Sequence, residues 1–158
     1  MTDDVRNKPP LSLVSGRVIA VCSSEKKGTP KADVCKGVLE VGFGLKGDAH
    51  GGDWHRQVSL LSIEQIETMK NKGYDVQPGS FAENICTQGF NLGSVKIGMR
   101  LKVGETAIIE VTQIGKECHT HCAIYNKIGE CIMPEQGVFA KVIEGGVINS
   151  GDTIELTQ

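Results

Sequence analysis

The sequence of 158 residues has few aromatic side chains and almost no net charge. Aromatic residues make up 4% of the chain, and its only tryptophan, Trp54, has no aromatic cluster around it in the sequence. This scarcity argues against a platform on which nucleic-acid bases stack. The formal net charge of −2 supplies no global basic field for a nucleic acid or an anionic membrane. We therefore expect neither kind of partner.

Long apolar runs are also absent. No segment approaches the roughly 20 apolar residues of a membrane helix, and the polar, proline-containing N-terminus does not resemble a secretory signal. We expect a cytoplasmic protein whose six cysteines stay reduced, so a disulfide framework is the weaker interpretation. The length is typical of one domain, and we assign residues 1–11 to a flexible leader and 12–158 to that domain.

Glycine is abundant, with 20 residues against roughly 11 at the usual frequency of about 7%. Many tight turns between short strands explain such an excess, which favours a β-barrel or a β-sandwich. A two-residue hairpin turn is predicted at Gly104-Glu105, and residues 23–33 are predicted to form a loop. The predicted strands cover residues 15–22, 34–41, 57–61, 84–87, 100–103, 106–114, 138–144 and 153–156.

One long helix is predicted, beginning after Ser62. Ser62 and Gln65 have the spacing of a capping box, and Gly73 stands where the first residue beyond a helix is often glycine. The apolar side chains that share one face of this helix are Ile63, Ile66 and Met69.

A glycine-rich segment, 42–47, matches the pattern G-x-G-x-x-G of dinucleotide-binding proteins. That fingerprint requires a helix to begin at once, so that the pyrophosphate meets the helix N-terminus. The next residues, Asp-Ala-His-Gly-Gly-Asp, disfavour a helix because of their glycines. We therefore reject a dinucleotide site.

The following loop is rich in basic and imidazole side chains. Lys46, His50, His55 and Arg56 could surround an anionic ligand together with backbone N–H groups. Alternatively, the loop is purely structural, and Asp48 and Arg56 pair to hold its shape. The sequence chemistry leaves both interpretations open.

Residues 115–137 contain three of the six cysteines and two of the four histidines. Neighbouring cationic groups, Lys116, His119 and His121, could lower the pKa of Cys118 and make it a reactive thiolate or a soft metal ligand. The alternative is a zinc-stabilised, non-enzymatic interaction domain. Its ligands would be Cys118, His121, Cys122 and Cys131.

The remaining cysteines are expected to be structural. Cys22, Cys35 and Cys86 lie at ordinary or apolar positions, and free cysteine is among the most frequently buried residues. Cys122 and Cys131 have the same structural interpretation if they bind no metal.

The order of the segments resembles the MOSC domain, the module named for the C-terminal part of molybdenum cofactor sulfurases. The resemblance extends over residues 16–156 and is specific as a combination. The matching segments are Gly-Asp-Ala-His (47–50), Arg-Gln-Val-Ser-Leu-Leu (56–61), Pro-Gly-Ser-Phe-Ala-Glu-Asn-Ile (78–85), Ile-Gly (97–98), Leu-Lys-Val-Gly (101–104), Glu-Val-Thr-Gln (110–113), Gly-Lys-Glu-Cys (115–118), Gly-Val-Phe-Ala (137–140) and Gly-Asp (151–152).

This resemblance implies a mainly β fold, a strongly bent or closed barrel with a few short peripheral helices. It also implies a molybdenum cofactor as ligand, with Cys118 binding molybdenum or carrying sulfur as a persulfide. The same match implies a pocket for the pterin and its phosphate. Its residues would be Lys46, His50, Arg56, Ser59 and Asn84.

The sequence departs from larger relatives of this family in two respects. It contains no pyridoxal-phosphate desulfurase domain, so no pyridoxal phosphate is expected, and it lacks the additional N-terminal barrel of amidoxime-reducing enzymes. We therefore expect a protein that binds or delivers the cofactor or carries sulfur. The alternative is a reductase or sulfur-transfer enzyme that depends on a partner. Proteins that make the cofactor or donate sulfur are the expected partners.

Overall fold

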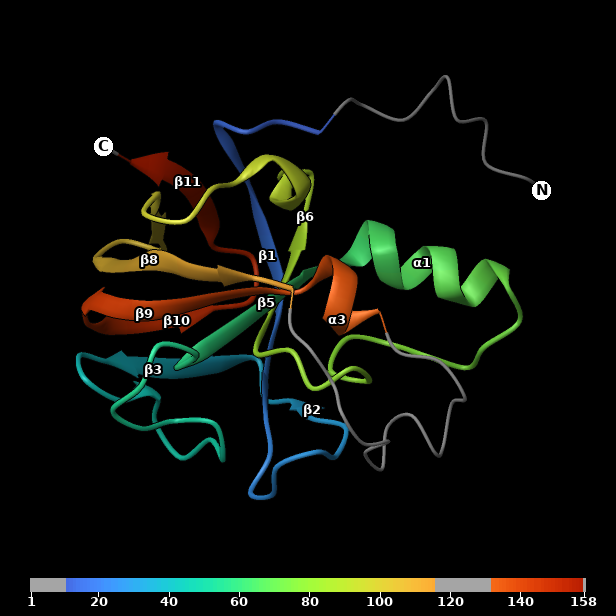
Figure 1. Cartoon of the computed structure of the whole chain (residues 1–158), viewed down its shortest axis with the longest axis horizontal. Coiled ribbons are helices and arrows are strands. Elements are labelled where there is room, and N and C mark those ends of the chain that lie inside the picture. The colour runs from blue at the N-terminus through green and yellow to red at the C-terminus, as the bar shows by residue number, and fades with distance from the viewer. Residues whose placement is uncertain (1–10, 116–131, 158) are drawn as a thin grey trace.

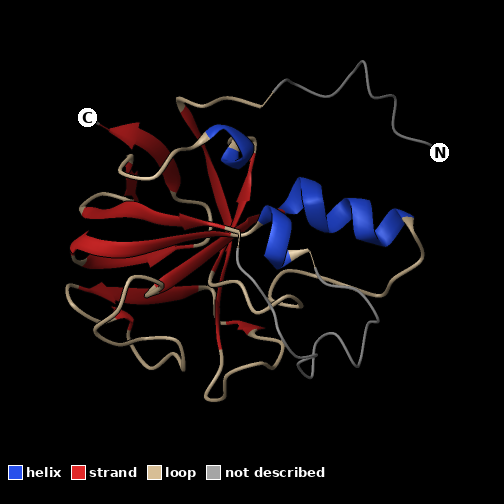
Figure 2. Cartoon of the chain, in the orientation of Figure 1, coloured by secondary structure: helices blue, strands red, loops and turns tan. Residues whose placement is uncertain are grey.

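Seven strands close into a barrel in the computed structural model of this chain (Figures 1 and 2). The structure describes residues 11–115 and 132–157. Around the barrel the strands follow the order β11-β7-β8-β9-β5-β6-β1, and β1 pairs back with β11 to close it. The neighbours are antiparallel except β5 and β6, which are parallel. The expectation of a mainly β, closed barrel is confirmed.

The predicted strands all have counterparts in the structure. Those of the barrel are β1 (Ser15–Ser23), β5 (Val58–Ser62), β6 (Ile85–Gln88), β7 (Arg100–Val103), β8 (Ala107–Ile114), β9 (Val138–Glu144) and β11 (Thr153–Thr157). A smaller sheet contains β10 (Gly146–Asn149), β3 (Lys36–Glu40) and β4 (Gly44–Leu45), and β2 (Ala32–Asp33) extends β1. The strands β2, β4 and β10 were not predicted: β2 and β4 have only two residues each, and β10 buries only Ile148, so none of them shows an apolar period.

Two connections between strands were predicted from the sequence, the one between β7 and β8 and the glycine-rich segment 42–47. The β7–β8 connection contains three residues, 104–106, because Val103 pairs with Ala107, so the two-residue hairpin turn is wrong. Residues 42–47 contain β4 and turns and are followed by no helix before β5, so the expectation that no helix begins after this glycine-rich segment is confirmed.

The helix α1 (Ile63–Asn71) forms the crossover between the parallel strands β5 and β6. Ser62 caps it, since its Oγ accepts a hydrogen bond from the N–H of Gln65 at 3.2 Å. Gly73 has a φ of +99°, as the prediction of a glycine terminus requires. The other helices of the described residues are short, η2 (Leu92–Ser94) and α3 (Met133–Gln136). No helix within 11–115 or 132–157 is long and apolar enough to cross a membrane.

The apolar core has two parts, on opposite sides of the barrel wall. Side chains such as Leu60 and Ile109 fill the interior of the barrel. The adjacent Leu61 points outward and packs with Ile66 and Met69 of α1. Because β5 is covered on both faces, all five of its residues are buried, which explains its apolar sequence.

Two of the three cysteines expected in the core lie there. Cys22 and Cys86 are 0% exposed, and burial, reinforced by the charge of Glu83, raises the pKa of both thiols. Both are therefore packing residues. The expectation for Cys35 is wrong: it is exposed, at a positive φ of 67° between β2 and β3.

Gly79 holds the connection between α1 and β6 against the segment around Lys31. The N–H of Lys31 donates to the carbonyl oxygen of Gly79 at 2.7 Å, and the φ of Gly79 is +93°. A Cβ atom at position 79 would overlap the carbonyl oxygen of Lys31. Gly73 also has a positive φ, but a Cβ there would meet nothing within 4 Å.

We predict that Gly79→Ala destabilises the protein more than Gly73→Ala. The backbone conformation costs each variant about 1–2 kcal/mol, and the overlap adds about 1–3 kcal/mol at position 79 only. Urea unfolding of the two variants measures the difference. Equal losses would show that the close approach of Gly79 to Lys31 does not constrain this connection.

Candidate functional site

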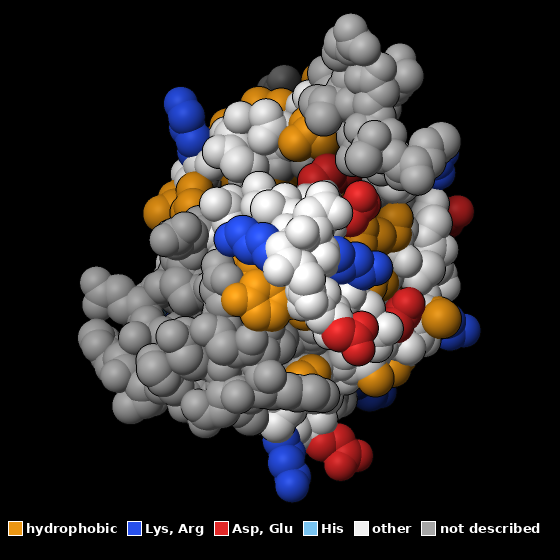
Figure 3. All heavy atoms as spheres, turned by 90° about the vertical axis from the view of Figure 1, so that its right-hand side faces the viewer, with side chains coloured by type: hydrophobic (Ala, Val, Ile, Leu, Met, Phe, Trp, Pro, Cys, Tyr) orange, Lys and Arg blue, Asp and Glu red, His pale blue; other side chains and the backbone are white. Residues whose placement is uncertain are grey.

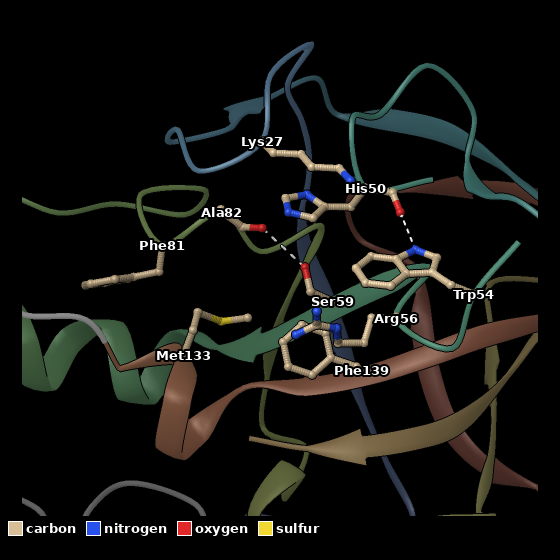
Figure 4. A pocket seen from close by; sticks show the side chains of 9 residues that line it. All are labelled: Lys27, His50, Trp54, Arg56, Ser59, Phe81, Ala82, Met133 and Phe139. Atoms are coloured by element: carbon tan, nitrogen blue, oxygen red, sulfur yellow. Dashed lines mark hydrogen bonds between the residues drawn. The ribbon is translucent and has the colours of Figure 1, made fainter. Parts of the chain in front are cut away.

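A cavity of about 260 Å³ lies outside the barrel, beside the outward faces of β5 and β9 (Figure 4). Its side chains come from segments far apart in the sequence: the loop after β1, the loop before β5, the two strands, the loop before β6, and α3. The described residues that line it are Lys27, His50, Trp54, Arg56, Ser59, Phe81, Ala82, Met133 and Phe139.

The floor of the cavity is set by the register of the barrel. Ser59 of β5 and Phe139 of β9 are directly paired, so both side chains point to the same, outward face of the sheet. The hydroxyl of Ser59 donates to the carbonyl oxygen of Ala82 at 3.2 Å, which joins the strand to the loop above it (Figure 4).

Arg56 lies between two aromatic rings at the edge of this floor. Its guanidinium carbon is 4.6 Å from the centre of the Trp54 ring and 5.7 Å from that of Phe139. Both distances permit cation–π attraction. The indole is itself fixed, since its N–H donates to the carbonyl oxygen of His50 at 2.8 Å. The Nε atom of Arg56 is buried and has no hydrogen-bond partner within the described residues.

Lys27 approaches the same indole, with its Nζ atom 5.5 Å from the ring centre. Two cationic side chains, Lys27 and Arg56, therefore line the cavity, and both lie near the ring of Trp54. None of the nine described lining residues carries a carboxylate. The described lining of the cavity is therefore positively charged, although the whole chain has a net charge of −2. On the face that includes α1, by contrast, basic, acidic and apolar side chains are interspersed (Figure 3).

A buried ion pair fixes the loops above the cavity. Lys31 Nζ lies 2.8 Å from Asp48 Oδ1, and both side chains are 0% exposed. The Asp48 carboxylate also accepts the N–H groups of Ser24 at 3.1 Å and His50 at 3.0 Å. Burial alone would raise the pKa of Asp48, but Lys31 and these N–H groups outweigh burial and lower that pKa. The suggested pairing of Asp48 with Arg56 is therefore wrong, because Lys31 occupies this position.

The ammonium group of Lys31 also contacts two other side chains. It lies 2.9 Å from Ser24 Oγ and 3.0 Å from His50 Nδ1. Through Lys31 the ion pair thus reaches His50, whose imidazole lines the cavity and is 23% exposed.

Asn84 lies behind the cavity floor. It is 0% exposed and does not line the cavity. Its Oδ1 atom accepts the N–H of Ser59 at 3.0 Å, and its side-chain amide donates to the carbonyl oxygen of Cys22 at 3.1 Å. Asn84 therefore joins β1 to β5 and fixes the backbone from which Ser59 projects.

A second buried carboxylate, Glu83, holds the loop that forms the far wall. It accepts the N–H groups of Gly79 at 2.8 Å and Phe81 at 3.2 Å. Burial raises the pKa of Glu83 to about 7. The turn that it closes keeps Ala82 at a positive φ of 66°, with Phe81 and Ala82 both against the cavity.

The structure brings together three of the residues that the sequence analysis assigned to a cofactor pocket. His50, Arg56 and Ser59 line the cavity, Asn84 supports Ser59, and Lys46 is exposed and outside the lining. The predicted thiol or zinc residues Cys118, His121, Cys122 and Cys131 lie outside the described residues. Within the described residues, no group of three or more His, Cys, Asp and Glu side chains could hold a metal ion.

Sequence reasoning missed Lys27 and Lys31, which it placed in an ordinary loop. Lys31 meets Asp48 across 17 positions of sequence, and no local pattern reports such a contact. Trp54 was also missed, although the only tryptophan of the chain stands two residues before Arg56 and could have been recognised as its stacking partner.

The chain matches the MOSC domain over residues 46–155, which is more than half of its length. It therefore belongs to the MOSC domain family. Solved structures with the same fold include the YuaD protein of Bacillus subtilis, with a TM-score of 0.73, 19% identity, and coverage of 90% of this chain and 95% of that one.

Two further structures are similar, both of YiiM proteins. The one from Geobacillus stearothermophilus has a TM-score of 0.68 and 18% identity, and the alignment covers 90% of this chain and 75% of that one. The one from Escherichia coli has a TM-score of 0.65 and 21% identity, with 90% and 70% covered. At these identities the likeness establishes the fold. No curated protein matches the sequence.

We predict that Lys31→Met costs about 3–5 kcal/mol of unfolding free energy, because it leaves the Asp48 carboxylate buried and unpaired. Arg100→Met is the matched control: Arg100 pairs with Glu110 at 3.2 Å, but its side chain is 45% exposed. An exposed pair contributes at most about 1 kcal/mol. Denaturant unfolding compares the two variants. A Lys31 variant as stable as the Arg100 variant would contradict the role given to the buried pair.

Proposed function

We propose that this protein binds the molybdenum cofactor, with the phosphate-bearing end of the cofactor in the described cavity and the metal near Cys118. Membership of the MOSC family supports a ligand of this class. The observation that carries the proposal is the cavity with two cations, Lys27 and Arg56, and no carboxylate among its described lining residues.

The donor chemistry of the cavity fits a phosphate group. Arginine presents N–H groups in a planar fork that matches phosphate oxygens, and lysine adds a second positive charge. The buried Nε atom of Arg56 has no partner within the described residues, so it is available to a ligand oxygen. Ser59 forms part of the floor, where its hydroxyl donates to the carbonyl oxygen of Ala82 and accepts the N–H of Asn84.

The size of the cavity limits which part of the cofactor it accommodates. Cofactor pockets usually enclose about 300–1,000 Å³, and this cavity has about 260 Å³. We therefore assign the described cavity to one end of the cofactor, the anionic one. Asn84 contributes indirectly, by holding Ser59, and Lys46 is proposed to contact parts of the cofactor that lie outside the cavity.

Cys118 is proposed as the sulfur ligand of the metal. It follows Gln113 by five residues, and Gln113 pairs with Phe139 of the cavity floor. Five residues span at most about 17 Å, so the thiol is within reach of a ligand that extends from the cavity. A thiolate suits a soft metal that already has sulfur ligands. When bound, the cofactor supplies a redox-active metal.

Proteins that make the cofactor or supply its sulfur are the proposed partners, and the cytoplasm is the proposed compartment. Both assignments follow from the proposed ligand, which must be delivered to this chain or passed on from it.

The test is the molybdenum and pterin content of protein purified from a host that makes the cofactor. We expect both in the wild type. Arg56→Met removes one charge-assisted contact, worth about 1.5–3 kcal/mol, and should weaken binding by at least about tenfold. Arg17→Met is the matched control, because Arg17 is exposed and outside the cavity. Cys118→Ser should retain the pterin but lose one sulfur from the metal coordination seen by X-ray absorption.

Two results would contradict the proposal. One is the absence of molybdenum and pterin from the wild type under conditions that load a control protein. The other is equal cofactor content in the Arg56 and Arg17 variants.

A further inference from the structure

His55 stands between Trp54 and Arg56 in the chain, and it does not itself line the cavity that these two neighbours line. Two side chains from the end of β8 contact it. The hydroxyl of Thr112 contacts the carbonyl oxygen of His55, and the Oε1 atom of Gln113 lies 2.7 Å from Nε2 of the imidazole ring. The segment that carries both cavity residues is therefore attached to the barrel wall at its middle residue.

An irregularity in the pairing of β8 with β9 explains why two successive side chains reach one residue. Val111 pairs with Ala140 and Gln113 pairs with Phe139, so β8 has one residue more than β9 at this point. In a regular strand neighbouring side chains point to opposite faces, and a bulge changes these directions. The hydroxyl of Thr112 can therefore reach the same segment as Gln113, and it also lies 3.2 Å from the carbonyl oxygen of Phe139.

The amide group of Gln113 is hydrogen-bonded at both of its ends. Its Nε2 atom donates to the carbonyl oxygen of Gly115 at 2.8 Å. Because a carbonyl oxygen only accepts, the amide nitrogen faces Gly115 and the amide oxygen faces His55. The Nε2 atom of His55 is therefore the donor in its contact with Gln113.

Backbone hydrogen bonds continue from Gly115 to the opposite side of the cavity. The N–H of Gly115 donates to the carbonyl oxygen of Gly137 at 2.7 Å, and the N–H of Gly137 donates to that of Met133 at 3.0 Å. Met133 lines the cavity from α3, and it lies across the cavity floor from Trp54 (Figure 4). Gln113 therefore joins the two sides of the cavity.

We propose that Gln113 and Thr112 are positioning residues that hold the cationic side of the cavity, with Trp54 and Arg56, at a fixed distance from the α3 side. Neither residue is among the described lining of the cavity, so both act through the backbone and ring of His55. A guanidinium fork recognises phosphate oxygens only in the correct orientation, so the affinity for an anion depends on this attachment. The effect on the ligand rests on the proposed function, whereas the effect on the position of Trp54 does not.

The first test needs no ligand, because Trp54 is the only tryptophan of the chain and its fluorescence reports on this segment. Acrylamide quenching measures how far solvent reaches the indole. We expect stronger quenching in Gln113→Met and a larger increase in Thr112→Val/Gln113→Met. Gln113→Glu still accepts from His55 and should keep the wild-type quenching. The matched control is Gln88→Met, since Gln88 is exposed at the end of β6 and outside the cavity lining.

Inorganic phosphate is the probe for the ligand part, and calorimetry measures its binding to the full chain. Loss of the contact with His55 should weaken phosphate binding by about threefold to tenfold in Gln113→Met, the effect of one hydrogen bond. The double variant should bind still more weakly, and Gln88→Met should bind like the wild type. All comparisons use conditions in which every variant is folded, so that a role of Gln113 in overall stability alone would change neither quenching nor affinity.

The outcomes separate this inference from the proposed function. Wild-type quenching in the double variant overturns the inference, and so does equal quenching in Gln113→Glu and Gln113→Met. If quenching increases but phosphate affinity is unchanged, or if the wild type binds no phosphate, the role of these residues towards the ligand is wrong. If both measurements change as expected but the wild type contains no molybdenum or pterin, the identity of the cofactor fails and the positioning role stands.

Discussion

The buried ion pair between Lys31 and Asp48 is the constraint on which the candidate site depends. It joins the loop after β1 to the loop after β4, beside a backbone hydrogen bond from the N–H of Ala49 to the carbonyl oxygen of Ser24. Its carboxylate fixes the backbone of Ser24 and His50, and its ammonium group contacts the His50 ring. Taking two charges out of water is costly unless they are well paired and hydrogen-bonded, and here the Lys31 ammonium group lies 2.8 Å from Asp48 Oδ1, 2.9 Å from Ser24 Oγ and 3.0 Å from His50 Nδ1.

This arrangement divides the positive charges near the cavity into two kinds. Lys31 is sealed from solvent and stabilises the loops, whereas Lys27 and Arg56 lie against Trp54 and face the cavity. An aromatic face holds a cation without neutralising it, so these two charges remain available to an anion. The barrel supplies the rigid part of the site, because Ser59 and Phe139 are placed by paired strands and not by loops. The cavity therefore has a floor set by the paired strands β5 and β9, and the loops above it are held by the ion pair between Lys31 and Asp48.

Local patterns in the sequence predicted much of this fold. The capping pair Ser62 and Gln65 defined the start of α1, and alternating or continuous apolar runs located the barrel strands, because these signals depend on neighbours within a few residues. The family resemblance predicted the closed barrel and three residues of the cavity. Contacts between distant segments were not predictable: the pairing of Lys31 with Asp48, the parallel pairing of β5 and β6, and the pairing of β10 with β3 each join residues far apart in the sequence. Composition also failed for Cys35, whose exposure reflects a turn and not its residue type.

Amide hydrogen exchange in Lys31→Met tests the central claim most directly. The N–H groups of Ser24 and His50 donate to Asp48, and that of Ala49 donates to the carbonyl oxygen of Ser24. Under conditions in which both proteins are folded, these three amides should exchange at least about tenfold faster in the variant, because their opening costs less free energy. Amides of the β7–β8 pair should be unchanged. Equal protection of the three amides in the wild type and the variant would contradict the claim that this ion pair holds the site together.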